Sequence, residues 1–594
     1  MCGINGFFSS KYDGLEIIQK TNLSLKHRGP DSEGIYNANN GLYLGHRRLS
    51  IIDVKDRSNQ PFVSDCGNYI LIFNGEIYNF LNLKLKLQNI NVKFKTQSDT
   101  EVLLQSYIKL GLVETLNNIR GMFSFCIYDK IKEKLFLVRD HVGEKPLYYY
   151  KDSNFFYFSS EVKTFANLKS LGFEKKFNFN LINEYFRSAS ILDNSNTYFN
   201  NISKLEPAHY IEFDIKKNFL SKKKYWQLSQ HVSNISNNLN EISFEQLLTK
   251  SIKERLISDV PLGVMLSGGL DSSVIASIAQ KLSSKKINTF SLSFGDGLNE
   301  NYYANLAAKT IGTNHYEIKV DEKKIFPYLY DNIEVFDDLG STDPGILSLA
   351  FSTKFIRDHG IKTLLFGEGA DEILAGYKRF ALGTLPFSIL PNKINLMLYY
   401  YFFSRDNFKS LKKFYKNFIP IENKINNKNG SYLHKFLKFE IEDHLPNNYL
   451  MKIDKSTMYN SIEARVPYLD IDLISFLLNI DQKKLVSTNW FFKFEGNEKK
   501  ILRNLAKKYL PQDIHTRRKF GSMLNTKFFI LSNLDKIYDL LSGNNNTNFF
   551  EYFSKKEIYN ELDFIKKKKI INNNNESFFW RLLILLIYLK KNEN

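Results

Sequence analysis

The stretch PLGVMLSGGLDSSVIASIAQKL, residues 261–282, has the pattern of a buried strand, a glycine turn and a helix. The strand ends at Leu266, the glycine pair 268–269 allows a tight turn, and the helix begins near Asp271. The free N–H groups and the dipole of such a helix start form a site for an anion. No GK[ST] follows, so this is not a Walker A loop, and the stretch predicts a phosphate-binding loop of another type. Three hydroxyl side chains would add donors: Ser267, Ser272 and Ser273.

Strands and helices alternate on both sides of this loop. Residues 242–258 have the spacing of an amphipathic helix, residues 286–294 of a strand, residues 299–312 of a helix, and residues 361–376 of a strand, a turn and a helix. Such alternation predicts a parallel sheet with helices on both faces. Beyond about residue 380 the chain is expected to be mostly helical.

A second glycine turn, FGEGADE at residues 366–372, carries the acids Glu368, Asp371 and Glu372 at another helix start. Acids at that position are often only partners of the helix dipole. Beside a phosphate loop in the same sheet, they indicate Mg²⁺ or substrate chemistry, because Mg²⁺ binds carboxylate and phosphate oxygens. Asp271 and Asp371 are the magnesium candidates.

The first 165 residues have a different pattern, with short strands separated by polar turns. Asn74-Gly75 lies between two strand-like runs and predicts a β-hairpin turn. One helix is expected at residues 98–111, with Ser98 as its N-cap. The polar stretch 231–243 predicts a surface link. We therefore divide the chain into a first domain at 2–190, a connector at 191–240 and a second domain at 241–594.

Composition excludes several classes of protein. The formal net charge is +18, but the basic residues do not gather in one block, which favours compositional bias over nucleic-acid binding. Three cysteines without a CxxC pair make neither a disulfide framework nor a zinc site, and they favour a cytoplasmic location. The apolar stretch 577–591 is interrupted by Arg581 and is too short to span a membrane, so it predicts a buried terminal helix.

Several further motifs occur in order: MCGI at 1–4, RGPDSEG at 28–34, HRRLSIID at 46–53, FNGEIYN at 73–79, SDTEVLL at 98–104 and RDHVGEKPLYY at 139–149. Together with SGGLDS and FFWRLL near the end, they make the whole chain resemble the glutamine-hydrolysing asparagine synthetases, the B type. This resemblance implies an N-terminal nucleophile (Ntn) glutaminase of αββα type. An α/β ATP-pyrophosphatase domain with a helical C-terminal part would follow it.

The resemblance gives Cys2 the role of nucleophile. Removal of Met1 would free the α-amine of Cys2, whose pKa of about 8 suits a base at neutral pH, and the thiolate would attack the side-chain amide of glutamine. Asn74 and Gly75 resemble an oxyanion hole. The implied glutamine-binding residues are Arg48 for the α-carboxylate, Glu76 and Asp99 for the α-amine, and Leu49, Ser50, Ile51, Ile52, Asn74 and Gly75.

In the second domain the resemblance implies binding of ATP and Mg²⁺. Lys499, in EKKILR, matches a lysine that stabilises negative charge in the family, and Glu368 resembles an acid near the acceptor. The implied ATP-binding residues are Leu266, Ser267, Gly268, Gly269, Leu270, Asp271, Ser272, Ser273, Leu292, Phe366 and Gly367.

The carboxylate that receives the ammonia is the open question. Aspartate is the default, and a sugar uronic acid of surface-polysaccharide assembly is the alternative. The segment DDLGSTDPGILS, residues 337–348, only loosely resembles the acceptor-side pattern, with Asp338 and Asp343 as counterparts, and His141 stands where the family often has arginine. The expected partners are small molecules, with no nucleic acid and no membrane; whether the protein is a homodimer stays open.

Three other classes compete with this interpretation. Amidotransferases that make glucosamine phosphate or phosphoribosylamine share Cys2 but lack the phosphate loop. A β-lactam-forming synthetase does not need Cys2. A nucleic-acid binder would show salt-sensitive binding and no glutamine turnover.

Overall fold

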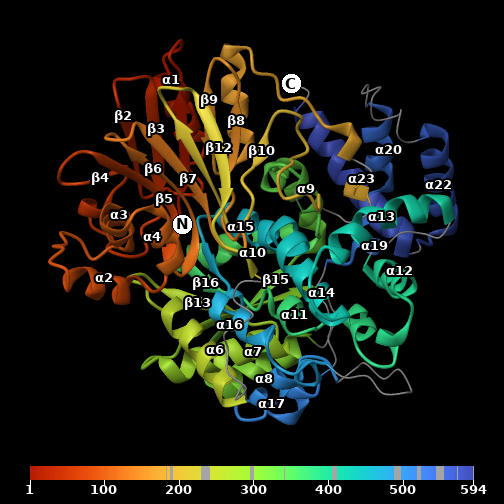
Figure 1. The fold of residues 1–594 in the computed structure, drawn as a ribbon. Helices are drawn as coiled ribbons and strands as arrows, with labels where there is room; N and C mark the ends of the chain where they lie inside the picture. Colours follow the sequence, from red (N-terminus) through yellow and green to blue (C-terminus); the bar gives the residue numbers. More distant parts are fainter. Residues whose placement is uncertain are drawn as a thin grey trace.

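The computed structural model describes residues 1–181, 184–186, 191–228, 241–294, 300–339, 341–403, 411–486, 497–517, 524–543, 554–571 and 573–592. The N-terminal half is a sandwich of two antiparallel sheets (Figure 1). The first sheet has the order β10-β8-β9-β1-β3-β2, with bounds β1 Gly3–Phe8, β2 Ser32–Asn37, β3 Leu42–Arg48, β8 Tyr148–Lys151, β9 Phe156–Ser159 and β10 Ser203–Lys204. The second has the order β12-β11-β7-β6-β5-β4, with bounds β4 Phe62–Val63, β5 Tyr69–Ile77, β6 Gly121–Asp129, β7 Lys134–Arg139, β11 His209–Asp214 and β12 Phe219–Lys224.

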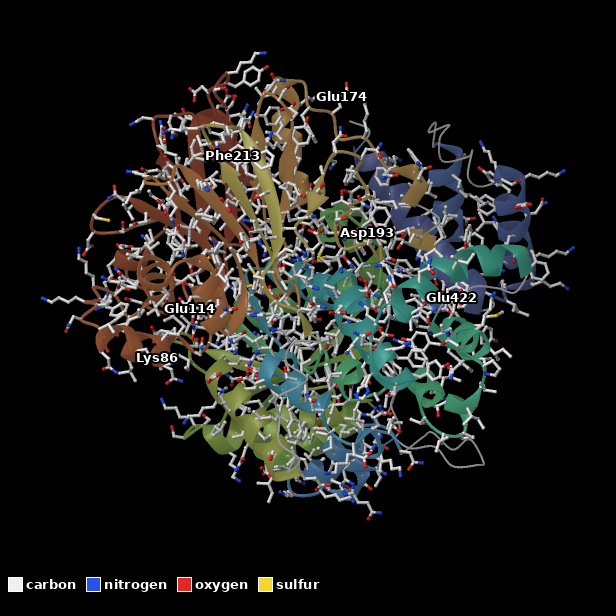
Figure 2. All side chains as sticks on the ribbon, viewed as in Figure 1. Lys86, Glu114, Glu174, Asp193, Phe213 and Glu422 are labelled. Atoms are coloured by element: carbon white, nitrogen blue, oxygen red, sulfur yellow. The ribbon has the colours of Figure 1, made fainter. Side chains whose placement is uncertain are left out.

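Apolar side chains from both sheets meet in the middle of the sandwich, among them Phe8, Ile72 and Phe213. Phe213 on β11 is fully buried, whereas Lys86 and Glu114, on the helices of the same domain, are exposed (Figure 2). Helix α1 (Leu15–Ser24) packs on the first sheet, and α3 (Asp99–Leu110) packs on the second beside α2 (Phe80–Gln88) and α4 (Leu112–Asn118). These four layers confirm the expected αββα glutaminase fold, with more helix than the single one expected at 98–111. Ser98 caps α3 as predicted, because its side chain accepts a hydrogen bond from Thr100 N–H.

The expected hairpin turn at Asn74-Gly75 is wrong. Strand β5 continues through both residues, and Asn74 and Gly75 pair with Ser124 and Phe123 of β6. The neighbouring strand overrides the local turn preference of an Asn-Gly pair. The segment 191–240, expected as a connector, supplies β10, β11 and β12 to the two sheets.

The second half is built on a parallel sheet of five strands in the order β15-β14-β13-β16-β17. The strands are β13 Leu262–Met265, β14 Asn288–Phe294, β15 Asn314–Val320, β16 Thr363–Leu365 and β17 Glu463–Arg465. Helices α6 Glu241–Arg255, α7 Leu270–Leu282, α8 Glu300–Ile311 and α11 Ala370–Ile373 lie where the alternating pattern predicted helices. Helices α9 Glu322–Asp331 and α10 Gly345–Asp358 were not predicted. Because β13 and β16 are parallel neighbours, the two glycine turns at their carboxyl ends lie side by side.

The C-terminal part is helical, as expected. It contains α12 Asn392–Phe403, α13 Leu411–Asn426, α14 Tyr432–Phe439, α15 Tyr449–Met458, α16 Ile471–Leu477, α17 Lys500–Ala506, α18 Gln512–His515, α19 Thr526–Ser532, α20 Leu534–Ser542, α22 Lys555–Lys568 and α23 Asn573–Asn592. The apolar stretch near the end forms the buried helix α23, which packs on α19 and α20 (Figure 1). Among the described helices, none has the length and apolar character that a membrane crossing requires.

Candidate active site

The N-terminus lies in the middle of the molecule, between the two halves (Figure 1). Cys2 directly precedes β1 and is 6% exposed. Its backbone N–H donates to Asn74 Oδ1 at 2.9 Å. Burial raises the pKa of the Cys2 thiol, while the terminal ammonium, the Leu49 backbone N–H and the Arg48 guanidinium oppose that rise. Three groups that stabilise a thiolate therefore surround this thiol.

The ammonium of Met1 reaches across the domain boundary. It lies 2.8 Å from Glu463 Oε2, at the first residue of β17 in the parallel sheet, and both groups are fully buried. Burial alone would raise the pKa of Glu463, but the ammonium and Arg465 together lower it. The second domain thus supplies an acid at the N-terminus, close enough to act on the Cys2 thiol.

Asn74 and Gly75 lie on β5 beside Cys2, where the resemblance put an oxyanion hole. Asn74 is fully buried, and its Nδ2 donates to Ser124 Oγ at 3.4 Å. Gly75 has φ +155°, and a Cβ there would lie 2.0 Å from the carbonyl oxygen of Met122. The close approach of β6 therefore requires glycine at this position.

Arg48, at the end of β3, is held by the loop that follows it. Its Nη1 donates to Lys55 O at 3.0 Å and Asn59 Oδ1 at 2.9 Å, and its Nη2 donates to Ile52 O at 3.3 Å and Asp53 O at 2.6 Å. If Arg48 binds a substrate carboxylate through both Nη atoms, the carboxylate must replace some of these four hydrogen bonds.

The rest of the expected glutamine-binding loop lies at the domain boundary, with contacts to both domains. Ser50 N–H donates to Asp31 Oδ2 at 2.8 Å, and the carbonyl of Ile51 accepts from the backbone N–H of Asp259 at 3.0 Å. Leu49 is buried with Ile51 in an apolar cluster at the domain boundary.

Glu76 and Asp99 lie together beneath this loop. Asp99 Oδ2 accepts from Ile77 N–H at 2.9 Å, and burial raises the pKa of Asp99 to about 6. Burial, and then the charges of Asp99 and Glu463, raise the pKa of Glu76 well above its ordinary value. Such a desolvated group of acids favours a cationic guest such as an α-ammonium group.

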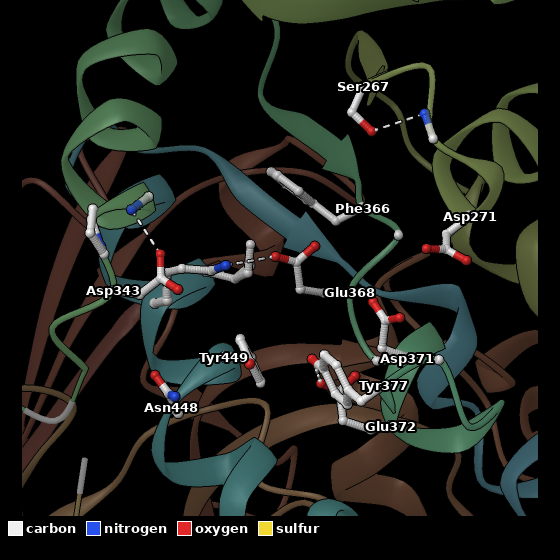
Figure 3. Close-up of a pocket in the computed structure, with 18 of the residues that line it drawn as sticks. Ser267, Asp271, Asp343, Phe366, Glu368, Asp371, Glu372, Tyr377, Asn448 and Tyr449 are labelled. Atoms are coloured by element: carbon white, nitrogen blue, oxygen red, sulfur yellow. Dashed lines mark hydrogen bonds and ion pairs between the residues drawn. The ribbon is translucent and has the colours of Figure 1, made fainter. Parts of the chain in front are cut away.

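A cavity of about 830 Å³ opens at the carboxyl ends of β13, β14 and β16. Most of the expected nucleotide-binding residues line it: Ser267, Gly269, Leu270, Asp271, Ser272, Leu292, Phe366 and Gly367 (Figure 3). The other three do not. Leu266 packs in the core, Gly268 approaches the backbone of α8, and Ser273 lies one turn inside α7 with a buried hydroxyl.

Lys499 lies between the two magnesium candidates. Its Nζ is 2.7 Å from Asp271 Oδ2 and 2.8 Å from Asp371 Oδ1. Burial alone would lower the pKa of Lys499, but the two carboxylates raise it above its ordinary value. Two carboxylates that converge on a cation have the chemistry of a Mg²⁺ site, so the residues fit the metal. Within the described ranges no group of three or more histidine, cysteine or acidic side chains is placed to hold a metal ion, so Asp271 and Asp371 would be the only two protein carboxylates at this candidate site.

The far end of the cavity carries further charged groups. Tyr377 OH, which donates to Glu372 Oε1 at 2.5 Å, lies beside Asp371, and Lys452 Nζ lies 3.0 Å from Glu368 Oε1 towards the far end (Figure 3). Asp343 Oδ1 accepts from Gly345 N–H at 2.7 Å and lines the same end. Asp338 does not line the cavity; it hydrogen-bonds Tyr148 of the first domain. His141 is buried among Phe123, Tyr225 and Trp226, away from both sites.

Sequence analysis missed functional candidates in both halves. Arg28 lies in the RGPDSEG motif but received no role, and it donates to the carbonyl of Cys2 at 3.1 Å. Glu463 has no sequence signal that would place it beside residue 1. Arg517 lines the cavity and donates to Gly268 O at 3.0 Å, but it lies among many other basic residues of this chain.

Two family models match the chain. One, described as a glutamine amidotransferase domain, matches residues 1–226, and one described as asparagine synthase matches residues 243–589. The first match extends beyond the expected boundary at 190 and includes β10 to β12.

Curated relatives match along most of the chain. Asparagine synthetase [glutamine-hydrolyzing] 1 of Bacillus subtilis is 30% identical over 566 residues, which cover 88% of this chain and 86% of that protein. Asparagine synthetase B [glutamine-hydrolyzing] of Escherichia coli is 29% identical over 538 residues, with 87% and 81% covered. A putative asparagine synthetase [glutamine-hydrolyzing] 2 of Methanocaldococcus jannaschii is 34% identical over 402 residues, with 64% and 76% covered.

Proposed function

The chain belongs to the asparagine synthase family and is a glutamine-hydrolysing ligase, and from this premise we propose that it converts L-aspartate, L-glutamine, ATP and water to L-asparagine, L-glutamate, AMP and diphosphate. The observation that carries the proposal is the placement of Cys2 at the domain boundary, where its backbone N–H donates to Asn74 Oδ1 at 2.9 Å and the preceding residue, Met1, contacts Glu463 of β17. It joins the nucleophile of the glutaminase domain to the sheet whose loops surround the nucleotide cavity. Ammonia released at Cys2 would therefore start its path at the domain boundary.

The first half-reaction takes place at Cys2. After removal of Met1, the α-amine accepts the thiol proton, the thiolate attacks the amide carbon of glutamine, and the C–N bond breaks to release ammonia. Asn74 Nδ2 and the Gly75 N–H stabilise the developing oxyanion, and water then hydrolyses the thioester to glutamate. Arg48 holds the α-carboxylate, and Glu76 with Asp99 holds the α-ammonium group.

The second half-reaction takes place in the large cavity. A carboxylate oxygen of the acceptor attacks the α-phosphorus of ATP, and diphosphate leaves. The turn at residues 267–272 and Lys499 hold the phosphates, and Asp271 and Asp371 would hold Mg²⁺, which neutralises phosphate charge. Ammonia then attacks the acyl carbon and AMP leaves, with Glu368 as our candidate to accept the proton that ammonia loses.

Ammonia must stay unprotonated between the two sites. The apolar cluster of Leu49, Ile51, Tyr78, Met122 and Met458, which Met1 joins before its removal, lies at the domain boundary and contains residues of both halves. An apolar path beside this cluster would exclude the water that protonates ammonia. We propose that the ammonia route follows it.

One experiment tests the proposal. Purified protein is supplied with glutamine, Mg-ATP and a panel of carboxylates that includes aspartate and sugar uronates, and the release of AMP and glutamate is measured. Formation of AMP and asparagine that depends on aspartate supports the proposal. Formation of AMP only with a uronate would mean that the acceptor is a sugar uronic acid instead. The matched control is Cys2→Ala, which should lose glutamine use and keep the reaction with free ammonia.

A further inference from the structure

The C-terminal helix α23 forms one wall of the nucleotide cavity. Four of its residues line the cavity: Glu576, Ser577, Trp580 and Arg581. They lie at the end that also contains Thr342, Asp343, Pro344 and Gly345. We call residues 337–339 and 341–345 the acceptor-side segment, because their neighbours at the cavity are Glu368 and Lys452.

Two hydrogen bonds tie α23 to the acceptor-side segment. Trp580 Nε1 donates to the carbonyl of Thr342 at 2.8 Å, and Tyr588 OH donates to the carbonyl of Asp337. Trp580 and Tyr588 are only 3% and 2% exposed. Buried donors of this kind are costly to leave without an acceptor, so both bonds restrain the position of the segment.

The opposite side of the segment is held by the glutaminase domain and α15. The carboxylate of Asp337 accepts from the backbone N–H groups of Val162 at 3.0 Å and Lys163 at 2.9 Å. Lys455 Nζ of α15 lies 2.6 Å from Asp337 Oδ2. Asp337 therefore joins three parts of the molecule.

The backbone of the segment is strained where it is held. Asp337 has φ +49° and Leu339 has φ +57°, values that residues with a Cβ rarely adopt. Such conformations persist when the surrounding structure imposes them, and they concentrate at functional sites. The contacts from α23 and from the glutaminase domain supply that restraint.

The segment affects the charged groups at the acceptor end of the cavity. Burial alone would lower the pKa of Lys452, but the charges of Asp343 and Glu368 raise it above its ordinary value. A displacement of Asp343 would change the field at Lys452 and hence its pairing with Glu368. The position of the segment thus determines the charge arrangement that an acceptor meets.

We propose that α23 is a positioning element of the acceptor site, and that Trp580 and Tyr588 hold the acceptor-side segment in the geometry that binds the acceptor carboxylate substrate. The inference rests on the proposed function, because it takes this end of the cavity as the acceptor end. The donors of Trp580 and Tyr588 bond to carbonyls of this segment rather than to the turn at residues 267–272 at the nucleotide end. The two ends should therefore respond differently to a change in the helix.

The test is the pair of variants Trp580→Phe and Tyr588→Phe, each of which removes one donor and keeps an aromatic ring. The control is Tyr538→Phe, which removes a hydroxyl that donates to Asp563 within the same C-terminal helices, away from the cavity. We measure KM for aspartate, KM for ATP, glutaminase kcat/KM and Tm. The expected result is a rise in KM for the acceptor of roughly 3- to 10-fold in both variants, with KM for ATP and glutaminase activity within 2-fold of wild type. The control should match wild type in all four values.

Two outcomes overturn the inference: an unchanged acceptor KM in both folded variants, or a parallel rise in the KM for ATP and for the acceptor. If Trp580→Phe is too unstable to measure, Tyr588→Phe alone decides between these outcomes. Failure of the proposed function looks different, because wild-type protein would then form no asparagine from aspartate.

Discussion

The guanidinium of Arg28 donates a hydrogen bond of 3.1 Å to the carbonyl oxygen of Cys2. The same side chain, fully buried, donates to Glu161 at 3.0 Å and to Asp454 of α15 at 2.9 Å. One side chain therefore connects Cys2, the proposed nucleophile of the first domain, to the helix that carries Lys452 in the second.

Substitution Arg28→Gln should destabilise the protein, because it leaves the buried Asp454 without its main cation and removes one of the cations that pair with Glu161. Breaking a buried ion pair in this way costs about 3–5 kcal/mol. Chemical denaturation measures the change in the free energy of unfolding. The control is Lys20→Gln, which removes an exposed pair with Glu16 and should change that free energy by less than about 0.5 kcal/mol. Equal effects of the two substitutions would contradict the role of Arg28.

The substitution Asp99→Asn should change both the pH dependence of stability and the KM for glutamine. The pKa of Asp99 is raised to about 6 in the folded protein, so the folded state holds a proton that the unfolded state releases near pH 4. The Asp99 contribution to stability therefore falls as pH rises from about 4 to 6, and the variant should lose this dependence. The variant should also raise KM for glutamine by about 10-fold or more, since an ionised partner of the ammonium group is lost. Unfolding curves at pH 4, 6 and 8 check the first effect, and an unchanged slope between pH 4 and 6 would refute it.

Gly376→Ala should impair the nucleotide site while leaving the glutaminase site intact. A Cβ at this position would lie 2.0 Å from Asp371 Oδ1 and 2.3 Å from Lys499 Cε, so the ion pair between those residues must open. Displacement of a charged group that acts in the transition state costs about 10²–10³ in rate. The measurement is acceptor-dependent AMP formation with free ammonia, and glutamine hydrolysis is followed in parallel. The control is Gly543→Ala, at the exposed end of α20. Normal AMP formation by the Gly376→Ala variant would show that the reaction does not depend on the ion pair between Asp371 and Lys499.

The local patterns predicted the fold class well, because a strand, a glycine turn and a helix are specified by neighbouring residues. The turn at 267–272 and the acids of 366–372 meet in one cavity because β13 and β16 are parallel neighbours. The prediction of a turn at Asn74-Gly75 was wrong because the conformation there is not set by neighbouring residues. It is set by pairing with β6, a strand that lies far away in the sequence.

The contacts between the halves could not be predicted from local patterns. Met1 and Glu463 are 462 residues apart in sequence, and Arg28 and Asp454 are 426 apart. Each pair forms only because two separately specified domains pack together. The same holds for Trp580 and Thr342: the sequence indicated a buried terminal helix, but its place in the wall of the cavity depends on the tertiary fold.

The side chain of Asn74 offers an acceptor and a donor, and two substitutions should distinguish their proposed roles. Its Oδ1 accepts from the Cys2 nitrogen at 2.9 Å, whereas its Nδ2 is the candidate donor to the oxyanion. Asn74→Asp keeps the acceptor and loses the donor, so glutaminase kcat should fall by about 10²–10³. Asn74→Ala loses both groups, so glutaminase kcat should fall at least as far. This variant should also have an altered dependence of kcat on pH near the pKa of the Cys2 amine. Ammonia-dependent AMP formation serves as the internal control and should stay unchanged in both. If Asn74→Asp hydrolyses glutamine at the wild-type rate, the oxyanion must be stabilised by another donor, and the backbone N–H of Gly75 is then the group to examine.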